Sequence, residues 1–138
     1  MAVQMVLTAA YVNLTGPGDI SGNLKKAELQ MEVDEKDVTN FTSLGWKEVK
    51  GGLKSGSLAL EFQNDMTAGG LDQLMFAAFG TVIAFEVRAS QSAVSTSNPK
   101  YTGSVLIKSW TPVSGAPGDV NGASFTYPTS GAVTRATS

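Results

Sequence analysis

Residues 51–62 read GGLKSGSLALEF and residues 22–33 read GNLKKAELQMEV, so one pattern occurs twice in the chain. Both segments follow G-x-L-K-x-x-x-L-x-x-E and then an apolar residue. Apolar residues at every second position predict a half-buried strand in each segment, at about residues 24–34 and 53–63. The face expected to build the core carries Leu29, Met31, Val33, Leu58, Leu60 and Phe62.

The opposite face of both predicted strands is polar. It carries Glu28, Gln30, Glu32, Ser57, Ala59 and Glu61. We expect the two strands to present this surface together. The leading leucine of each segment, Leu24 or Leu53, has the opposite parity from the later apolar residues. It either joins the acidic face or marks a β-bulge between the two halves of its strand.

The rest of the chain supplies further strands and one helix. Apolar residues at helical spacing from Leu71 to Phe79 (Leu71, Leu74, Met75, Ala78 and Phe79) predict a helix from about Gly70 to Phe79, which ends before Gly80. The other expected strands span Tyr11 to Leu14, Thr81 to Arg88, Tyr101 to Trp110 and Val120 to Tyr127, with turn residues between them. This order predicts a mainly β fold, a β-sandwich or barrel of two packed sheets with one flanking α-helix.

With 138 residues, the chain is most simply a single domain, residues 1–138. Residues 1–10 are expected to be an N-terminal arm or first strand, and residues 129–138 a disordered end or a C-terminal arm that orders on a neighbour. Residues 35–46 predict an unusually long loop with four apolar residues, Val38, Phe41, Leu44 and Trp46. The loop either folds back on its own core or docks on another subunit.

Composition excludes several classes of function. The chain has 10 Lys and Arg against 12 Asp and Glu, a net charge of −2, so it lacks the basic surface that holds nucleic acid tightly. Cysteine and histidine are both absent, which removes thiolate chemistry, the commonest metal ligand and the commonest general base. No charged secretory signal precedes the apolar N-terminus, and the longest apolar region is shorter than the roughly 20 residues of a membrane span.

The remaining chemical motifs are weak. Lys54-Ser55 lies among glycines, but the spacing of a phosphate-binding loop fails and a strand follows. The acidic run of Asp34, Glu35 and Asp37 lacks the alternating oxygens of a calcium loop, so a solvated turn explains it better. Paired glutamates such as Glu32 and Glu61 are suited in principle to glycoside hydrolysis, but no cleft is indicated. We expect no enzymatic activity, metal or cofactor.

From Asp19 through Arg135 the chain resembles the tail tube, or major tail, proteins of bacteriophages with long non-contractile tails. The resemblance rests on ordered blocks: DISGNLK (19–25), VDEKD (33–37), GGLKSGSLALEF (51–62), AGGLDQL (68–74), GTVIAFEVR (80–88) and STSNPKYTG (95–103). Each block alone is unspecific, whereas the ordered set covers nearly the whole chain. Larger family members carry an extra immunoglobulin-like domain, which this sequence lacks, so we expect no adhesion to cell surfaces.

The resemblance implies a structural virion protein, assembled in the host cytoplasm. Subunits would form hexameric rings that share an inner β-barrel and stack into a tube for DNA ejection. The implied partners are further copies, the tail tip and terminator proteins, and the tape measure protein inside the tube, with DNA passing without binding and no membrane contact. An acidic inner wall would leave DNA mobile, and we expect Glu28, Glu32, Glu61 and Glu86 to face this lumen. Alternatively, this face is simply exposed in a monomer.

A second class of function stays open. The chain is also consistent with a small β-sandwich binding module, such as a capsid decoration or carbohydrate-binding domain. Such a module is expected to present an exposed aromatic platform, for which Trp46 and Trp110 are the candidates. They lie far apart in the sequence.

Overall fold

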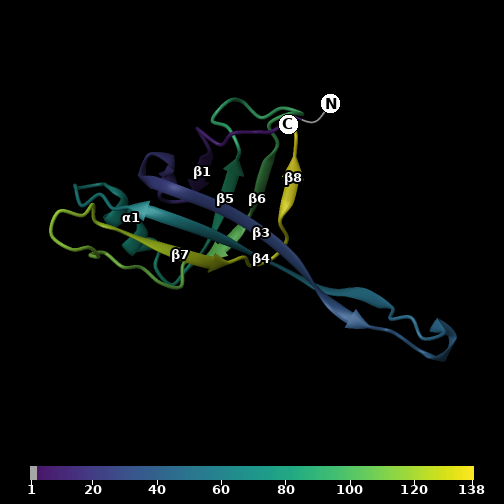
Figure 1. Ribbon diagram of the computed structural model, residues 1–138. Coiled ribbons are helices and arrows are strands. Elements are labelled where there is room, and N and C mark those ends of the chain that lie inside the picture. The colour runs from purple at the N-terminus through teal and green to yellow at the C-terminus, as the bar shows by residue number, and fades with distance from the viewer. Residues whose placement is uncertain (1–2) are drawn as a thin grey trace.

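The computed structural model describes residues 3–138, which form two antiparallel β-sheets with one short α-helix (Figure 1). The five-stranded sheet has the order β2-β1-β5-β6-β8, and the three-stranded sheet has the order β3-β4-β7. The elements are β1 (Tyr11–Leu14), β2 (Gly18–Asp19), η1 (Ser21–Asn23), β3 (Leu24–Asp37), η2 (Phe41–Ser43), β4 (Val49–Gln63), α1 (Leu71–Ala78), β5 (Val82–Arg88), β6 (Lys100–Leu106), β7 (Gly122–Pro128) and β8 (Thr134–Ala136). The predicted fold class is confirmed.

The core lies between the two sheets, where the alternating apolar residues of facing strands meet. Its fully buried side chains include Val12, Leu14, Leu58, Phe62, Met75, Val105, Ile107 and Tyr127. Aromatic rings fill one region of this core: Phe125 stacks on Trp110 and on Tyr127, with ring centroids 5.4 and 5.6 Å apart. Burying each such side chain contributes about 1.5–3 kcal/mol relative to exposure, so the alternation of β4 and β7 determines which face turns inward.

Helix α1 confirms the predicted helix, with Gly70 and Phe79 as its caps. Leu71, Met75 and Ala78 are buried as expected, but Phe79, predicted to join the apolar stripe, is half exposed. It lies beyond the last helical turn and therefore leaves the buried face. The indole Nε1 of Trp110 donates a hydrogen bond to Oδ1 of Asp72 at 3.0 Å, which ties the helix to the core.

Both repeated segments contain a register irregularity at their leading leucine, as the bulge interpretation predicts. Leu24 lies opposite Phe62 while Lys26 lies opposite Glu61, so Lys25 is the extra residue, and Leu24 packs against the core. In the second segment, Lys54 lies opposite Val33 while Gly51 lies opposite Glu35, so β4 has one extra residue between these two pairs. Leu53 lies within this irregularity, and its side chain is exposed. The same sequence pattern therefore has a partly buried leucine at one end of the hairpin and an exposed one at the other.

Strands β3 and β4 are longer than predicted and form a hairpin that projects from the body (Figure 1). Residues 35–37 were expected to begin a loop, but they pair with residues 49–51, so the connection spans only residues 38–48. The alternation fails here because the hairpin has left the core and neither face must be buried. For the same reason Met31 and Val33, expected in the core, are about half exposed, at 52% and 49%.

The two chain ends differ from each other. The described N-terminal residues 3–10 carry no regular strand and make one isolated bridge, between Ala9 and Ser90; residues 1–2 of the expected arm lie outside the described part. At the C-terminus, the expectation of a disordered end or an arm that orders on a neighbour stays a prediction, and the structure describes residues 134–136 within the chain itself. They form β8, which pairs with residues 100–102 of β6 and thereby satisfies the backbone of that edge.

Candidate functional site

The outer face of the three-stranded sheet gathers the polar residues of both repeated segments. Register places Glu28 opposite Ala59, Gln30 opposite Ser57 and Glu32 opposite Ser55. Side chains directly opposite each other in an antiparallel pair share one face. Strand β7 continues this surface with Ser124 and Thr126. The expectation that the two segments present one polar surface together is therefore confirmed, and we call it the outer polar face.

This face is less acidic than the glutamates alone suggest. Lys26 lies opposite Glu61 and makes an ion pair with Glu28 at 3.6 Å, and Lys25 lies 4.0 Å from Glu61. Within residues 3–138, Glu32 makes no ion pair. Exposed pairs of this kind are worth about 0–1 kcal/mol each, so their main consequence is partial neutralisation of the surface charge. Lys25 and Lys26 are visible in the sequence, but only the pairing register of β3 and β4 shows that they lie beside Glu28 and Glu61.

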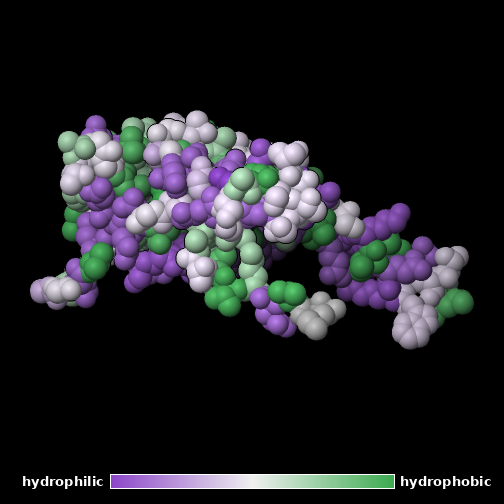
Figure 2. Space-filling model, turned by 90° about the horizontal axis from the view of Figure 1, so that it is seen from above, coloured by the Kyte–Doolittle hydropathy of each residue, from purple (hydrophilic) through white to green (hydrophobic). Residues whose placement is uncertain are grey.

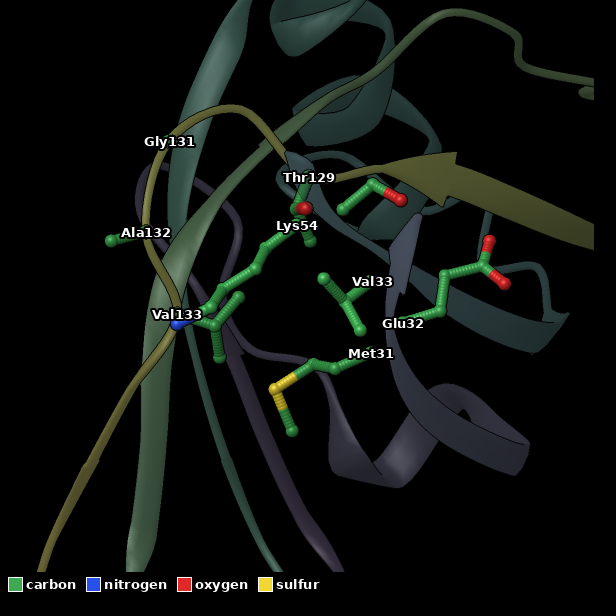
Figure 3. A pocket seen from close by; sticks show the side chains of 9 residues that line it. Met31, Glu32, Val33, Lys54, Thr129, Gly131, Ala132 and Val133 are labelled. Carbon is green, nitrogen blue, oxygen red and sulfur yellow. The ribbon is translucent and has the colours of Figure 1, made fainter. Parts of the chain in front are cut away.

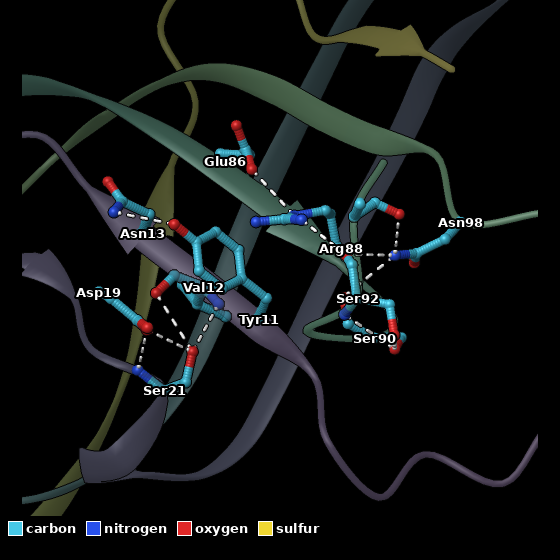
Figure 4. A network of polar contacts seen from close by, with 11 residues as sticks. Tyr11, Val12, Asn13, Asp19, Ser21, Glu86, Arg88, Ser90, Ser92 and Asn98 are labelled. Atoms are coloured by element: carbon cyan, nitrogen blue, oxygen red, sulfur yellow. Dashed lines mark hydrogen bonds and ion pairs between the residues drawn. The ribbon is translucent and has the colours of Figure 1, made fainter. Parts of the chain in front are cut away.

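Glu86 is not brought together with the other three predicted residues. It lies on β5 in the five-stranded sheet and pairs with Arg88 at 3.0 Å (Figure 4). The Arg88 guanidinium also stacks 3.9 Å from the centre of the Tyr11 ring and donates a hydrogen bond to the carbonyl oxygen of Ser92. Figure 4 thus shows Glu86 within a network that fixes the serine-rich connection between β5 and β6. Glu86 lies in the five-stranded sheet, whereas Glu28 lies in the three-stranded sheet.

The connection between β3 and β4 forms a compact apolar tip. Three apolar side chains of this connection are almost fully exposed to solvent, with relative exposures of 103% for Phe41, 85% for Leu44 and 79% for Trp46. Val38 is much less exposed, at 37%. We call Phe41, Leu44 and Trp46 the hairpin tip. The alternative of a flap folded on its own core is wrong, because the tip lies at the far end of the projecting hairpin (Figure 2).

Local hydrogen bonds fix the backbone of this tip. The Asn40 side chain accepts a bond from the Thr42 amide, and the Ser43 hydroxyl accepts one from the Asn40 amide, which makes a reciprocal capping box around η2. Lys47 and Glu35 form an ion pair of 3.1 Å at the base of the connection. The tip is therefore a shaped projection, although Leu44 requires a left-handed backbone conformation at φ 53°.

A pocket of about 400 Å³ lies where the hairpin leaves the body (Figure 3). Met31 and Val33 of β3 form one wall, and the segment leading into β8, with Val133, forms the other. Figure 3 shows these three side chains pointing into the space, whereas Glu32 points away from it. The Lys54 side chain extends across the pocket toward Val133. We call this site the hairpin-base pocket; sequence reasoning missed it because it assigned Met31 and Val33 to the core.

Among residues 3–138 no three acidic side chains converge as a metal site, and no helix is long and apolar enough to cross a membrane. Trp110 packs against Phe62 and Phe125, far from the exposed Trp46, so these two residues form no common aromatic platform. The surfaces that stand out are the outer polar face, the hairpin tip and the hairpin-base pocket.

The fold is shared with chains of virus-like particles. One solved structure, a chain from the virion of a native gene transfer agent particle, superposes with a TM-score of 0.68 and 19% identity, covering 91% of this chain and 94% of that chain. Another, from the tail of an empty gene transfer agent particle with C6 symmetry, gives 0.66 and 21%, covering 91% and 92%. No protein-family model matches the sequence, and no curated protein matches it significantly. At this identity the likeness establishes the fold.

Proposed function

We propose that this chain is a structural subunit of a phage-like tail tube, in which hexameric rings stack into a conduit for DNA. The observation that carries the proposal is a fold shared over 91% of the chain with a tail built on C6 symmetry. The projecting hairpin and its exposed apolar tip support the proposal further. Exposing Phe41 and Trp46 to water does not stabilise a monomer, whereas burying them against another subunit would stabilise an assembly.

Ring closure would use the open edges of the three-stranded sheet. Strands β3 and β7 are its outer members, and each has an edge without a partner strand in the described chain. Both run antiparallel to β4, so they are parallel to each other. Rotation about a ring axis preserves strand direction. Neighbours would therefore join β7 to β3 as a parallel pair, or through an intervening segment that runs antiparallel to both.

The outer polar face would line the lumen, with Glu28, Glu32 and Glu61 facing the DNA. Its mixed charge is suited to passage, because phosphate gains no strong cationic partner and counterions are not released. Glu86 lies on the other sheet and is the least supported of the four predicted lumen residues. The role requires no catalytic chemistry, so we propose that the protein is not an enzyme.

Concentration-dependent assembly tests the proposal. Purified protein is followed by light scattering and negative-stain electron microscopy as its concentration rises. We expect rings or filaments with a central channel and sixfold symmetry in end views. A protein that stays monomeric at every concentration would instead favour the small binding module.

A further inference from the structure

We infer that the hairpin-base pocket of one copy is the socket for the hairpin tip of another copy. This inference rests on the proposed function and adds the receiving surface for the tip. The volume of about 400 Å³ falls within the about 300–1,000 Å³ of pockets that enclose small ligands, which is enough for bulky side chains such as those of the tip. The walls are mainly apolar, as the tip is.

A tip cannot enter the pocket of its own chain. The pocket lies at the level of Val33, which pairs with Lys54 at the base of the hairpin. The ladder then continues outward to the pair of Asp37 and Val49 before the connection begins. Folding the tip back would break these backbone hydrogen bonds. The tip that fills the pocket must therefore belong to a second molecule.

The tip is prepared for docking. Association loses free energy when flexible side chains and loops become ordered, by about 0.5–1.5 kcal/mol for each immobilised side chain. The capping box around Asn40 and the pairing of the flanking strands already fix the backbone that carries Phe41. An aromatic side chain has few rotatable bonds, so the tip can bury a large apolar area at small conformational cost.

The hairpin tip and the hairpin-base pocket are different parts of the same chain, so a contact between the tip of one copy and the pocket of another is heterologous. Such a contact closes into a ring or continues as an open stack, and it does not stop at a dimer. The hairpin points away from the body (Figure 1), so a copy placed along its direction would receive the tip while offering its own tip onward. This geometry is that of a stacked assembly.

Charge supports the same pairing. Lys54 extends across the pocket, and Glu48 follows the tip; neither makes an ion pair within residues 3–138. Docking the tip would bring this unpaired carboxylate toward this unpaired ammonium group. An exposed pair contributes little energy, but it selects the orientation in which the tip enters.

Cysteine crosslinking tests the contact directly, because the chain has no cysteine of its own. A chain carrying Leu44→Cys is mixed with one carrying Val133→Cys and treated with a short bis-maleimide. A matched control pairs Leu44→Cys with Thr96→Cys, an exposed site on the serine-rich connection. We expect several-fold more crosslinked dimer for the pocket pair than for the control. Equal yields would overturn the inference.

Charge reversal gives a second test that does not depend on crosslinking. Glu48→Lys alone and Lys54→Glu alone should each weaken assembly by about two- to fivefold, and the double reversal should restore it. Tubes that form normally without the pocket crosslink would overturn the socket and leave the proposed function standing. Failure of the wild-type chain to form rings or tubes would reject the proposed function, while the crosslink assay at high concentration would still decide the socket.

Discussion

Lys26 and Glu61 lie directly opposite each other across β3 and β4, on the outer polar face of the three-stranded sheet. Lys26 also pairs with Glu28, so one lysine sits between two of the carboxylates expected to line a tube. The face therefore has mixed charge with an acidic excess. Such a surface repels DNA weakly and binds it weakly, which suits a conduit better than strong charge of either sign.

Reversing charge on this face should convert it into a DNA-binding surface. We expect the triple variant Glu28→Lys, Glu32→Lys, Glu61→Lys to fold and assemble, with a stability loss of about 1 kcal/mol because the lysine introduced by Glu61→Lys would face Lys26. Assembled tubes should then retain DNA in a salt-dependent manner, and genome delivery should fall. The corresponding triple Gln variant should be intermediate. Unchanged DNA retention and unchanged delivery would place this face outside the tube.

Replacing the tip should separate folding from assembly. Because the Val38 amide donates a backbone hydrogen bond to the Glu48 carbonyl oxygen, residues 39–47 can be replaced by Asn-Gly, which closes a two-residue hairpin and keeps this bond. We expect a monomer with unchanged urea unfolding that forms no tubes in electron micrographs. A point variant, Trp46→Ser, should alter monomer stability by less than about 0.5 kcal/mol because the side chain is exposed. Normal tubes from the replaced chain would remove the tip from assembly.

The turn before α1 should loosen in acid. The Thr67 hydroxyl and amide donate hydrogen bonds to Oδ1 of Asp65, at 2.7 and 3.0 Å, and these bonds lower the pKa of Asp65. A carboxyl with a lowered folded-state pKa stabilises the fold above its unfolded pKa of about 3.9, and this contribution is lost as pH falls through the folded value. The protection of the Thr67 amide against exchange, taken relative to the intrinsic exchange rate at each pH, should therefore fall below about pH 4. Asp65→Asn should remove this pH dependence; an unchanged profile would contradict the assignment.

The hydroxyl of Tyr127 should matter for stability. Tyr127 is fully buried, burial raises the pKa of its hydroxyl, and the group donates a 2.9 Å hydrogen bond to the carbonyl oxygen of Ser109. Tyr127→Phe leaves that carbonyl unpaired and should cost about 1–3 kcal/mol in urea unfolding. Tyr101→Phe, at a partly exposed tyrosine, is the matched control and should cost less than about 0.5 kcal/mol. Equal losses for both would show that the buried bond is not the cause.

Much of the fold follows from local patterns. Helix α1 was predicted between Gly70 and Phe79 because its apolar spacing and its terminal glycines agree with each other. The buried face of β4 was predicted because the large apolar residues Leu58, Leu60 and Phe62 occupy every second position before Gln63. Strand β8 (Thr134–Ala136) was not predicted, because these residues show no apolar alternation and form a strand only by pairing with β6.

The sequence by itself determined that the chain is mainly β, that residues 22–33 and 51–62 each form a strand with a polar face, and that the alternation breaks at the leading leucine of each. Alternation and parity are local properties, so they can be read from the chain. Only the tertiary structure decided that Met31 and Val33 line a pocket, that Glu86 lies apart from Glu28, and that Lys26 faces Glu61. Those relationships depend on how far the β3–β4 hairpin extends beyond the five-stranded sheet and on the pairing register of strands that are distant in the sequence. No local sequence pattern specifies either of these.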